Sequence, residues 1–183
     1  INIICPKIGE KYKHVKLAVK NAGENLKIKS SNLKNHYELL LKLKKLLNLN
    51  HIPQRIEAYD NSHIFGKQSL GVMIVVDNEG FASKYYRKFN IKFDKLESKK
   101  SISNDYYMLE EVLRRRLNRI DSQIEWSSPD IIMVDGGKGH LSIAKKIINE
   151  KKISDIKLIA VAKGKLRNLG KEILYYNSQE KML

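Results

Sequence analysis

Two aspartates each stand at the end of a short hydrophobic stretch of the kind that forms a buried β-strand. Asp60 ends RIEAYD (55–60) and Asp135 ends PDIIMVD (129–135). Two carboxylates that meet at one point repel each other, and a divalent cation relieves this repulsion. Mg²⁺ is typically held by one or two carboxylates, water and substrate phosphate. The pair therefore predicts a metal site for phosphodiester chemistry, although either aspartate alone is more often a turn former or a helix cap.

Further acidic and histidine side chains are weaker candidates. Asp105 is expected at the start of a helix, where it could cap the helix or complete a metal shell. His63 follows the first aspartate in a loop, where it could contact phosphate, carry a proton or serve only the structure. Strand alternation places Glu57 on the opposite face of the strand from Asp60, so Glu57 is a weaker candidate. Asp77 and Asp130 are interpreted as structural residues of turns.

The stretch GGKG that follows Asp135 is rich in glycine but lacks the GxxxxGK[ST] spacing of a nucleotide-binding loop. Gly136 and Gly137 are expected to leave room for a metal and a phosphate backbone. Lys138 is expected to contact a phosphate, and the helix after Gly139 is expected to turn its positive end toward the same place.

The elements that must position these residues follow a recognisable order. Periodicity predicts three strands, a helix, a strand, a helix and a strand, at 55–60, 70–77, 81–91, 105–120, 129–135, 140–150 and 156–163, with a further strand at 171–177. A meander followed by a strand–helix–strand crossover gives a mixed α/β sheet, which is the order of the ribonuclease-H-like fold. A doubly wound fold competes, but it would place helices between the first strands. Parallel pairing of the first and fourth strands would bring the two aspartates together.

The composition indicates a basic globular protein of 183 residues with a net charge of +15 and a pI of about 9.7. Such a charge favours a polyanionic partner, although many of the lysines are equally explained by compositional drift. Arginine is scarcer, and four of its seven copies fall in RRRLNR (114–119). The arginine-rich helix is therefore a candidate nucleic-acid contact. The alternative is that these arginines form ion pairs with Glu110 and Glu111.

The first fifty residues contain eleven lysines and no aspartate, and KLAVKNAGENL (16–26) and HYELLLKLKKLLNL (36–49) have helical patterns. We expect a helical lead-in over 1–52 that packs on a domain spanning 53–183; a helix that binds a partner is the alternative. No stretch of 18 apolar residues and no signal-peptide pattern is present. Cys5 is the only cysteine, which excludes a disulfide framework and a thiolate zinc site and favours a cytoplasmic location.

Several long motifs in one order resemble the C-terminal endonuclease domain of the UvrC family, the incision component of the excinuclease ABC system. They are IPQRIEAYDNSHIFG, NDYYMLEEVLRRRLNR, PDIIMVDGGKGH and IAVAKGK, and KLAVKNAGENL is similar to the family's linker helix. The resemblance covers most of the chain. It implies a ribonuclease-H-like endonuclease that makes the 5′ incision in nucleotide excision repair with Mg²⁺ or Mn²⁺.

The resemblance also implies roles for individual residues. Asp60, Asp105 and Asp135 match catalytic carboxylates, and Asp60 and Asp135 are expected to bind the metal. Full-length members also carry a GIY-YIG nuclease, a UvrB-binding segment and helix-hairpin-helix motifs, none of which lies within these residues. Damaged duplex DNA is the expected partner, and UvrB bound to DNA would be reached through segments outside this chain. The residues expected at DNA are His63, Arg114, Arg115, Lys138, Lys163, Lys165 and Arg167.

Three departures from the family pattern stand out. Asn61 replaces the usual isoleucine and His140 the usual glutamine. The family's catalytic histidine lies in a later segment, and none of the five histidines of this chain matches it. Two alternatives to the endonuclease therefore remain: a catalytically incomplete DNA-binding fragment of such a protein, and a related metal-dependent phosphoryl chemistry such as RNA cleavage.

Overall fold

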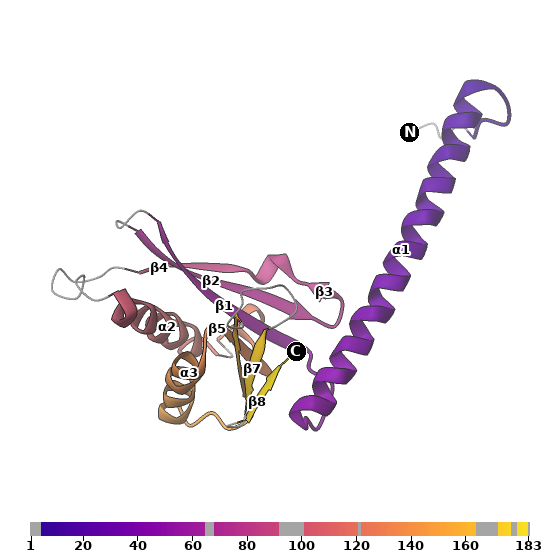
Figure 1. Cartoon of the computed structure of the whole chain (residues 1–183). Coiled ribbons are helices and arrows are strands. Elements are labelled where there is room, and N and C mark those ends of the chain that lie inside the picture. The colour runs from indigo at the N-terminus through magenta and orange to yellow at the C-terminus, as the bar shows by residue number, and fades with distance from the viewer. Residues whose placement is uncertain are drawn as a thin grey trace.

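The computed structural model describes residues 5–64, 68–91, 101–120, 122–163, 172–176 and 179–182. Within them, three α-helices accompany one eight-stranded mixed sheet (Figure 1). The helices are α1 (Gly9–Leu47), α2 (Ser101–Leu117) and α3 (Lys138–Glu150). The strands are β1 (Arg55–Ile64), β2 (Gln68–Asp77), β3 (Gly80–Phe81), β4 (Arg87–Ile91), β5 (Ile131–Asp135), β6 (Lys157–Ala162), β7 (Ile173–Tyr176) and β8 (Gln179–Met182). No helix in these ranges is long and apolar enough to cross a membrane.

The sheet has the strand order β3-β2-β1-β5-β6-β7-β8, with β4 also paired to β2. The first strands form an antiparallel meander, because β2 pairs antiparallel with both β1 and β4. β5 then lies parallel to β1, and β6 lies parallel to β5. This arrangement confirms the predicted ribonuclease-H-like sheet, and its central parallel strands run toward a common edge.

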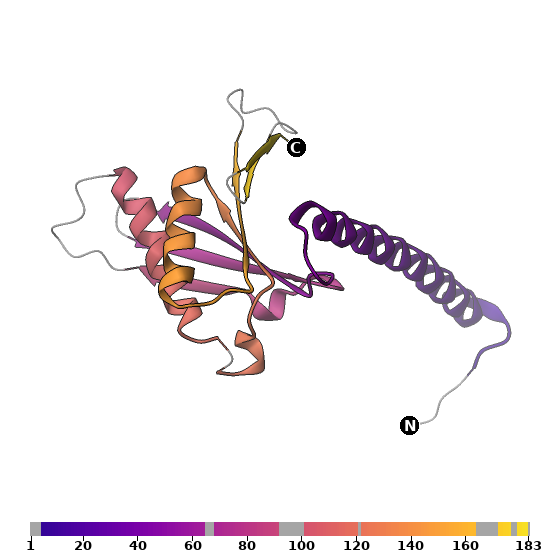
Figure 2. The same cartoon turned by 90° about the horizontal axis from the view of Figure 1, so that it is seen from below.

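Alternation along the central strands divides the core into two layers. Tyr59, Ile132 and Val134 face α2 and α3, whose buried residues complete the larger cluster. The neighbouring positions Ile56 and Ile131 face the other side and pack against the C-terminal end of α1. Figure 2 shows α2 and α3 on one face of the sheet and α1 on the other side. β5 therefore has buried residues on both of its faces, which explains its nearly continuous apolar run.

The N-terminal segment forms one long helix and not two. Leu40 and Leu47 are buried against the sheet, whereas the helix before them extends away from it (Figure 1). The helix ends at Asn48, which adopts a left-handed conformation (φ 50°) and donates its backbone N–H to carbonyl groups of the last turn. The expectation that the lead-in packs on the domain therefore holds for its C-terminal end alone.

Several element boundaries differ from the sequence-based expectation. The strand expected to end at Asp60 continues four residues further, to Ile64, because β1 remains paired with β2 over that stretch. The strand expected over 81–91 is interrupted by a short 3₁₀ turn at Ser83–Tyr85, so it becomes β3 and β4. α2 begins at Ser101, four residues before the expected start. β8 was not expected, and it pairs antiparallel with β7. Periodicity does not detect such a short polar strand, because its pairing partner and not its sequence defines it.

A buried ionic network joins β1 to α2. Glu57 and Arg116 are both 0% exposed, and the Arg116 Nη2 atom lies 2.6 Å from the Glu57 Oε1 atom. Arg55 donates from Nε to the same carboxylate at 2.7 Å, and Tyr59 donates its hydroxyl at 2.6 Å. Arg116 also donates to the backbone oxygen of Ser127 at 2.7 Å. The network satisfies both buried charges, as an ion pair away from water requires.

Tyr59 remains a donor in this network at any ordinary pH. Its burial raises the pKa of the Tyr59 hydroxyl well above the usual value, and the negative charge of Glu57 raises that pKa further. The opposing influence of Arg116 and Arg55 on the pKa of Tyr59 is smaller. The protonated hydroxyl therefore supplies one of the hydrogen bonds that make a carboxylate tolerable at this depth.

We predict that Arg116→Ala lowers the free energy of unfolding by about 3–5 kcal/mol, because it leaves Glu57 charged and buried without its main partner. Arg115→Ala is the matched control. Its side chain is 42% exposed and pairs with Glu111 on the helix surface, so a loss of about 0–1 kcal/mol is expected. Urea unfolding followed by circular dichroism measures both values, and equal losses would contradict this account.

Candidate active site

The two candidate aspartates lie on neighbouring strands of the sheet: Asp135 is the last residue of β5, whereas Asp60 lies within β1, which continues to Ile64. In the parallel pairing of β1 with β5, Tyr59 is the register partner of Val134, and Asp60 and Asp135 each follow by one residue. Adjacent strands lie about 4.8 Å apart. Both side chains belong to the face that Ile56 and Ile131 define, because alternation returns to the same face every second residue. Both aspartates are exposed.

This arrangement suits a hard divalent cation. Two carboxylates that point to one face from adjacent strands leave further coordination positions for water and phosphate oxygen, as Mg²⁺ requires. The described residues contain no group of three or more acidic, histidine or cysteine side chains that could hold a metal ion. Asp60 and Asp135 are therefore the residues that could hold a metal, with oxygen ligands from outside the chain completing its coordination.

Asp105 lies in the second turn of α2 and is half-buried. It is not the N-cap of this helix, because α2 begins four residues earlier. The Asn61 side chain donates from Nδ2 to the Asp105 backbone oxygen at 3.5 Å, so the residue after Asp60 contacts the helix that carries the third aspartate. The structure does not bring Asp105 into a three-ligand group with the other two aspartates. Its catalytic role stays a prediction.

The glycines after Asp135 serve a purpose that the sequence did not indicate. Gly136 has φ +139°, and a Cβ atom there would lie 2.3 Å from the His140 Nδ1 atom. A Cβ atom at Gly139 would lie 2.3 Å from the Tyr106 hydroxyl oxygen. The missing side chains at Gly136 and Gly139 therefore leave room for the rings of His140 and Tyr106. Gly137 alone of the three has open space around its missing Cβ, so only there is the expected room for a ligand present.

Tyr106 and His140 form the contact that these glycines permit. Their ring centroids lie 4.8 Å apart in an edge-on arrangement, which joins the beginning of α2 to the beginning of α3. The sequence marked His140 only as a departure from the family pattern. The spacing in GGKGH, with a histidine one helical turn after a glycine, could have indicated that the ring packs on the glycine. The contact of His140 with Tyr106 could not be read from the sequence, because Tyr106 is distant in the chain.

The arginines expected at DNA are occupied by acidic side chains. Arg114 contacts Glu110 and Glu150, each within 2.7 Å, and this bonding to Glu110 lowers the pKa of that carboxyl. Arg115 pairs with Glu111 at 2.6 Å. The ion pairs considered as the alternative are therefore formed. A role of Arg114 and Arg115 at DNA stays a prediction, and it would require contacts beyond these pairs.

Two of the lysines expected at DNA, Lys138 and Lys163, lie shortly after the ends of the parallel strands β5 and β6. Lys138 is the first residue of α3, where its ammonium group lies 3.0 Å from Glu180 of β8 and over the ring of Tyr175. The hydrogen bond that Lys138 donates to Glu180 raises the pKa of the lysine, which remains a cation. Lys163 is exposed immediately after β6. Lys165, Arg167 and the side chain of His63 lie outside the described residues.

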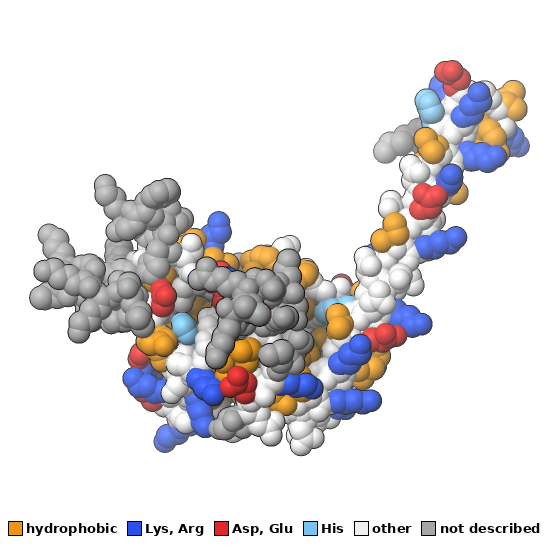
Figure 3. Space-filling view, in the orientation of Figure 1, with side chains coloured by type: hydrophobic (Ala, Val, Ile, Leu, Met, Phe, Trp, Pro, Cys, Tyr) orange, Lys and Arg blue, Asp and Glu red, His pale blue; other side chains and the backbone are white. Residues whose placement is uncertain are grey.

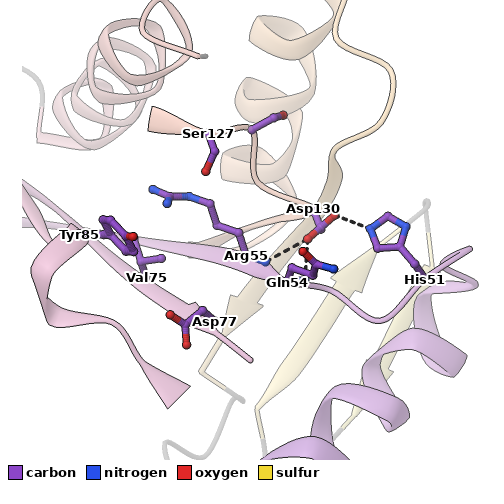
Figure 4. A pocket seen from close by; sticks show the side chains of 9 residues that line it. His51, Gln54, Arg55, Val75, Asp77, Tyr85, Ser127 and Asp130 are labelled. Carbon is purple, nitrogen blue, oxygen red and sulfur yellow. Dashed lines mark hydrogen bonds and ion pairs between the residues drawn. The ribbon is translucent and has the colours of Figure 1, made fainter. Parts of the chain in front are cut away.

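A separate cavity of about 420 Å³ lies at the opposite end of β1 and β5 (Figure 4). There Asp130 accepts hydrogen bonds from His51 at 2.7 Å and from the backbone N–H groups of Gln54 and Arg55 at 2.7 and 3.0 Å. Asp77 accepts the N–H of Glu79 within its turn. Asp130 and Asp77 are therefore structural, as predicted, and this cavity is distinct from the aspartate edge.

A mixed sheet with this strand order defines a ribonuclease-H-like domain, and the two aspartates on adjacent parallel strands are its candidate catalytic pair. The sequence matches the family described as "UvrC RNAse H endonuclease domain" over residues 44–183. The chain belongs to this family of endonuclease domains.

The chain is similar in sequence to several named proteins and, at lower identity, to solved structures. UvrABC system protein C of Zymomonas mobilis is 41% identical over 91% of this chain and 25% of its own length. The protein of the same name from Nitrobacter winogradskyi is 40% identical over 94% of this chain and 26% of its own length. The chain thus spans about a quarter of the curated relatives it matches. Ciona intestinalis endonuclease V with an inosine-containing DNA is 15% identical, with a TM-score of 0.43 over 61% of this chain and 47% of its own.

We predict that Gly139→Ala destabilises the protein by about 1–3 kcal/mol, since the new methyl group would overlap the Tyr106 ring. In an open helix the same change would stabilise by up to about 1 kcal/mol. Gly137→Ala is the control and should change the free energy of unfolding by less than about 1 kcal/mol, because nothing lies near its Cβ position. Thermal unfolding of both variants tests this, and a stabilised Gly139→Ala protein would refute the packing.

Proposed function

We propose that this chain is the metal-dependent endonuclease domain of an excinuclease, and that it makes the 5′ incision at damaged DNA in nucleotide excision repair. The observation that carries the proposal is the parallel pairing of β1 with β5, which sets Asp60 beside Asp135 with both residues exposed. The family supports DNA cleavage, and a net charge of +15 suits a polyanionic substrate. In domain terms, 1–52 would be the lead-in and 53–183 the nuclease.

Each part of the site has a task in this proposal. Asp60 and Asp135 would hold Mg²⁺ or Mn²⁺, which when bound polarises a phosphoryl group and neutralises the charge that develops on it. The first backbone N–H groups of α3 have no side-chain cap at Gly137, so they are available to a phosphate oxygen. Lys138 and Lys163 add positive charge beside them. The open space at Gly137 lets a DNA backbone approach closely.

The partners in this proposal are damaged duplex DNA and, through segments outside this chain, a complex of UvrB with DNA. His63, Arg114, Arg115, Lys165 and Arg167 are proposed as further DNA contacts. Asp105 is proposed to act beside the metal pair once substrate is bound. A cytoplasmic location follows from the proposed role in DNA repair.

A second candidate is a DNA-binding domain that lacks an independent cleavage activity. It is favoured by one observation: the described residues bring two carboxylates together and not three. In that case, the catalytic group that completes the site would come from another part of a longer protein. The two candidates share the DNA surface and differ only in whether this chain alone breaks a phosphodiester bond.

We predict that the chain nicks damaged duplex DNA with Mn²⁺, and that Asp60→Asn and Asp135→Asn each slow cleavage by about a hundredfold or more, because each removes one charged metal ligand. The control is Asp155→Asn, an exposed aspartate outside the site, which should cleave like the unmodified chain. Gel analysis of end-labelled duplex gives the rates, and binding of DNA should be retained. Equal binding without cleavage in any protein would favour the second candidate.

We also predict that removing both Lys138 and Lys163 weakens DNA binding and flattens its dependence on salt. The slope of log K against log salt should fall in magnitude by about 0.9 for each phosphate that is no longer neutralised. The matched control removes two exposed lysines far from the aspartates, Lys42 and Lys151. Fluorescence anisotropy at several salt concentrations measures the slopes, and an equal change in both double variants would show that only total charge matters.

A further inference from the structure

The projecting part of α1 carries an apolar stripe that nothing in the described residues covers. Apolar residues recur at a strict interval of seven along the helix: Tyr12, Val19, Leu26, Leu33, Leu40 and Leu47. A second row lies three residues after the first. It is apolar at Val15, Ala22 and Leu43 but polar at Lys29 and His36. A seven-residue repeat of this form is the seam of a coiled coil.

The two ends of the stripe have different surroundings. Leu40 and Leu47 are 2% and 3% exposed, because they pack against the sheet. Val19 and Leu26, which lie earlier on the same stripe, are 67% and 69% exposed. The half of the stripe that meets the domain is therefore used for packing, and the other half faces solvent. Figure 3 shows α1 standing clear of the body with its apolar and lysine side chains in view.

A hollow at the foot of the projecting helix continues this surface. A cavity of about 410 Å³ lies between α1 and the β2–β3 turn, and Leu33 and Phe81 line it. Phe81 is 76% exposed. His36 fixes one wall, since its Nε2 atom lies 2.6 Å from the Asp77 backbone oxygen. A helix lying along the stripe could therefore rest its end against the exposed ring of Phe81.

The helix has little of its own to stabilise the projecting turns. Within the described residues, the one ion pair on them joins Lys20 to Glu24 at 3.9 Å, with both side chains largely exposed. Such pairs contribute only about 0.3–0.5 kcal/mol. Most helical stability in proteins comes from burying an apolar face. A helix of this length with an uncovered seam therefore points to a missing partner.

Charge identifies the kind of partner. Residues 9–36 contain seven lysines and two glutamates. A second copy of α1 would set lysines against lysines, which disfavours self-association. Nucleic acid would neutralise the lysines but leave the seam in water. Leu17 and Ile28 are also exposed, but they lie on the opposite side of the helix from the seam. The helix therefore lacks the single broad apolar face with which a helix enters a membrane surface.

We propose that the seam of α1, from Tyr12 to Leu33, docks an acidic amphipathic helix of another protein. The partner helix supplies apolar residues at heptad spacing to Val19 and Leu26, and its flanking carboxylates face the lysines. Docking would bury the projecting part of the stripe, just as the sheet buries Leu40 and Leu47. The proposal does not depend on whether this chain cleaves DNA.

The test uses the whole chain and a labelled designed peptide about four heptads long, with leucine in the seam and glutamate beside it. A peptide with lysine in place of the glutamates is its counterpart. The seam variant carries Val19→Asn and Leu26→Asn. The matched control carries Leu17→Asn and Leu39→Asn, two exposed leucines of the same helix that lie off the seam. Circular dichroism establishes that all proteins fold, and fluorescence anisotropy measures binding.

The acidic peptide should bind the unmodified chain and the off-seam control within twofold of each other, and bind the seam variant at least tenfold more weakly. The lysine peptide should bind none of them. Equal loss in both variants, or equal binding of the two peptides, would overturn the proposal. So would dimerisation through the seam in sedimentation, or a seam-dependent affinity for duplex DNA or anionic vesicles that exceeds the affinity for the acidic peptide.

Discussion

The pairing of Glu57 with Arg116 is the constraint on which the arrangement of this domain rests. Both charges lie entirely out of water, and a buried charge is tolerated only when its hydrogen bonds are complete. Arg55 and Tyr59 occupy the remaining positions on the carboxylate. The network can close only if α2 crosses β1 at one place, so it sets the position of the helix that carries Asp105 relative to the strand that contains Asp60.

A second set of contacts fixes α3 and the loop after β5 relative to α2. Asn61 contacts the backbone of α2, and the ring of Tyr106 on α2 meets the ring of His140 on α3. Gly136 and Gly139 permit these rings to approach the loop after β5. The loop that follows the second strand-end carboxylate is thus held from α2 as well as from its own strand, because the absent side chains make room for structural neighbours.

The distribution of positive charge follows the same division between structure and surface. Arg114 and Arg115 pair with glutamates, and Arg116 is buried, so the most arginine-rich stretch of the sequence serves largely to hold the domain together. Arginine suits this task because its planar group satisfies a carboxylate with two bonds at once. Lysine remains for the exposed surfaces, at the beginning of α3 and along α1. A count of basic residues therefore overstates the positive charge that is left without acidic partners on the surface.

The sequence by itself predicted the main order of elements and singled out the two aspartates as candidates, because hydrophobic periodicity is local and a carboxylate that closes an apolar run is visible in a few letters. It also indicated the family, through long motifs in order. Only the tertiary structure decided that Gly139 accommodates the ring of Tyr106, that Arg116 pairs with Glu57, and that the seam of α1 is covered at one end by the sheet. Each of these depends on residues far apart in the chain, such as Tyr106 and Gly139. Their proximity follows from how helices pack on the sheet, which no local pattern records.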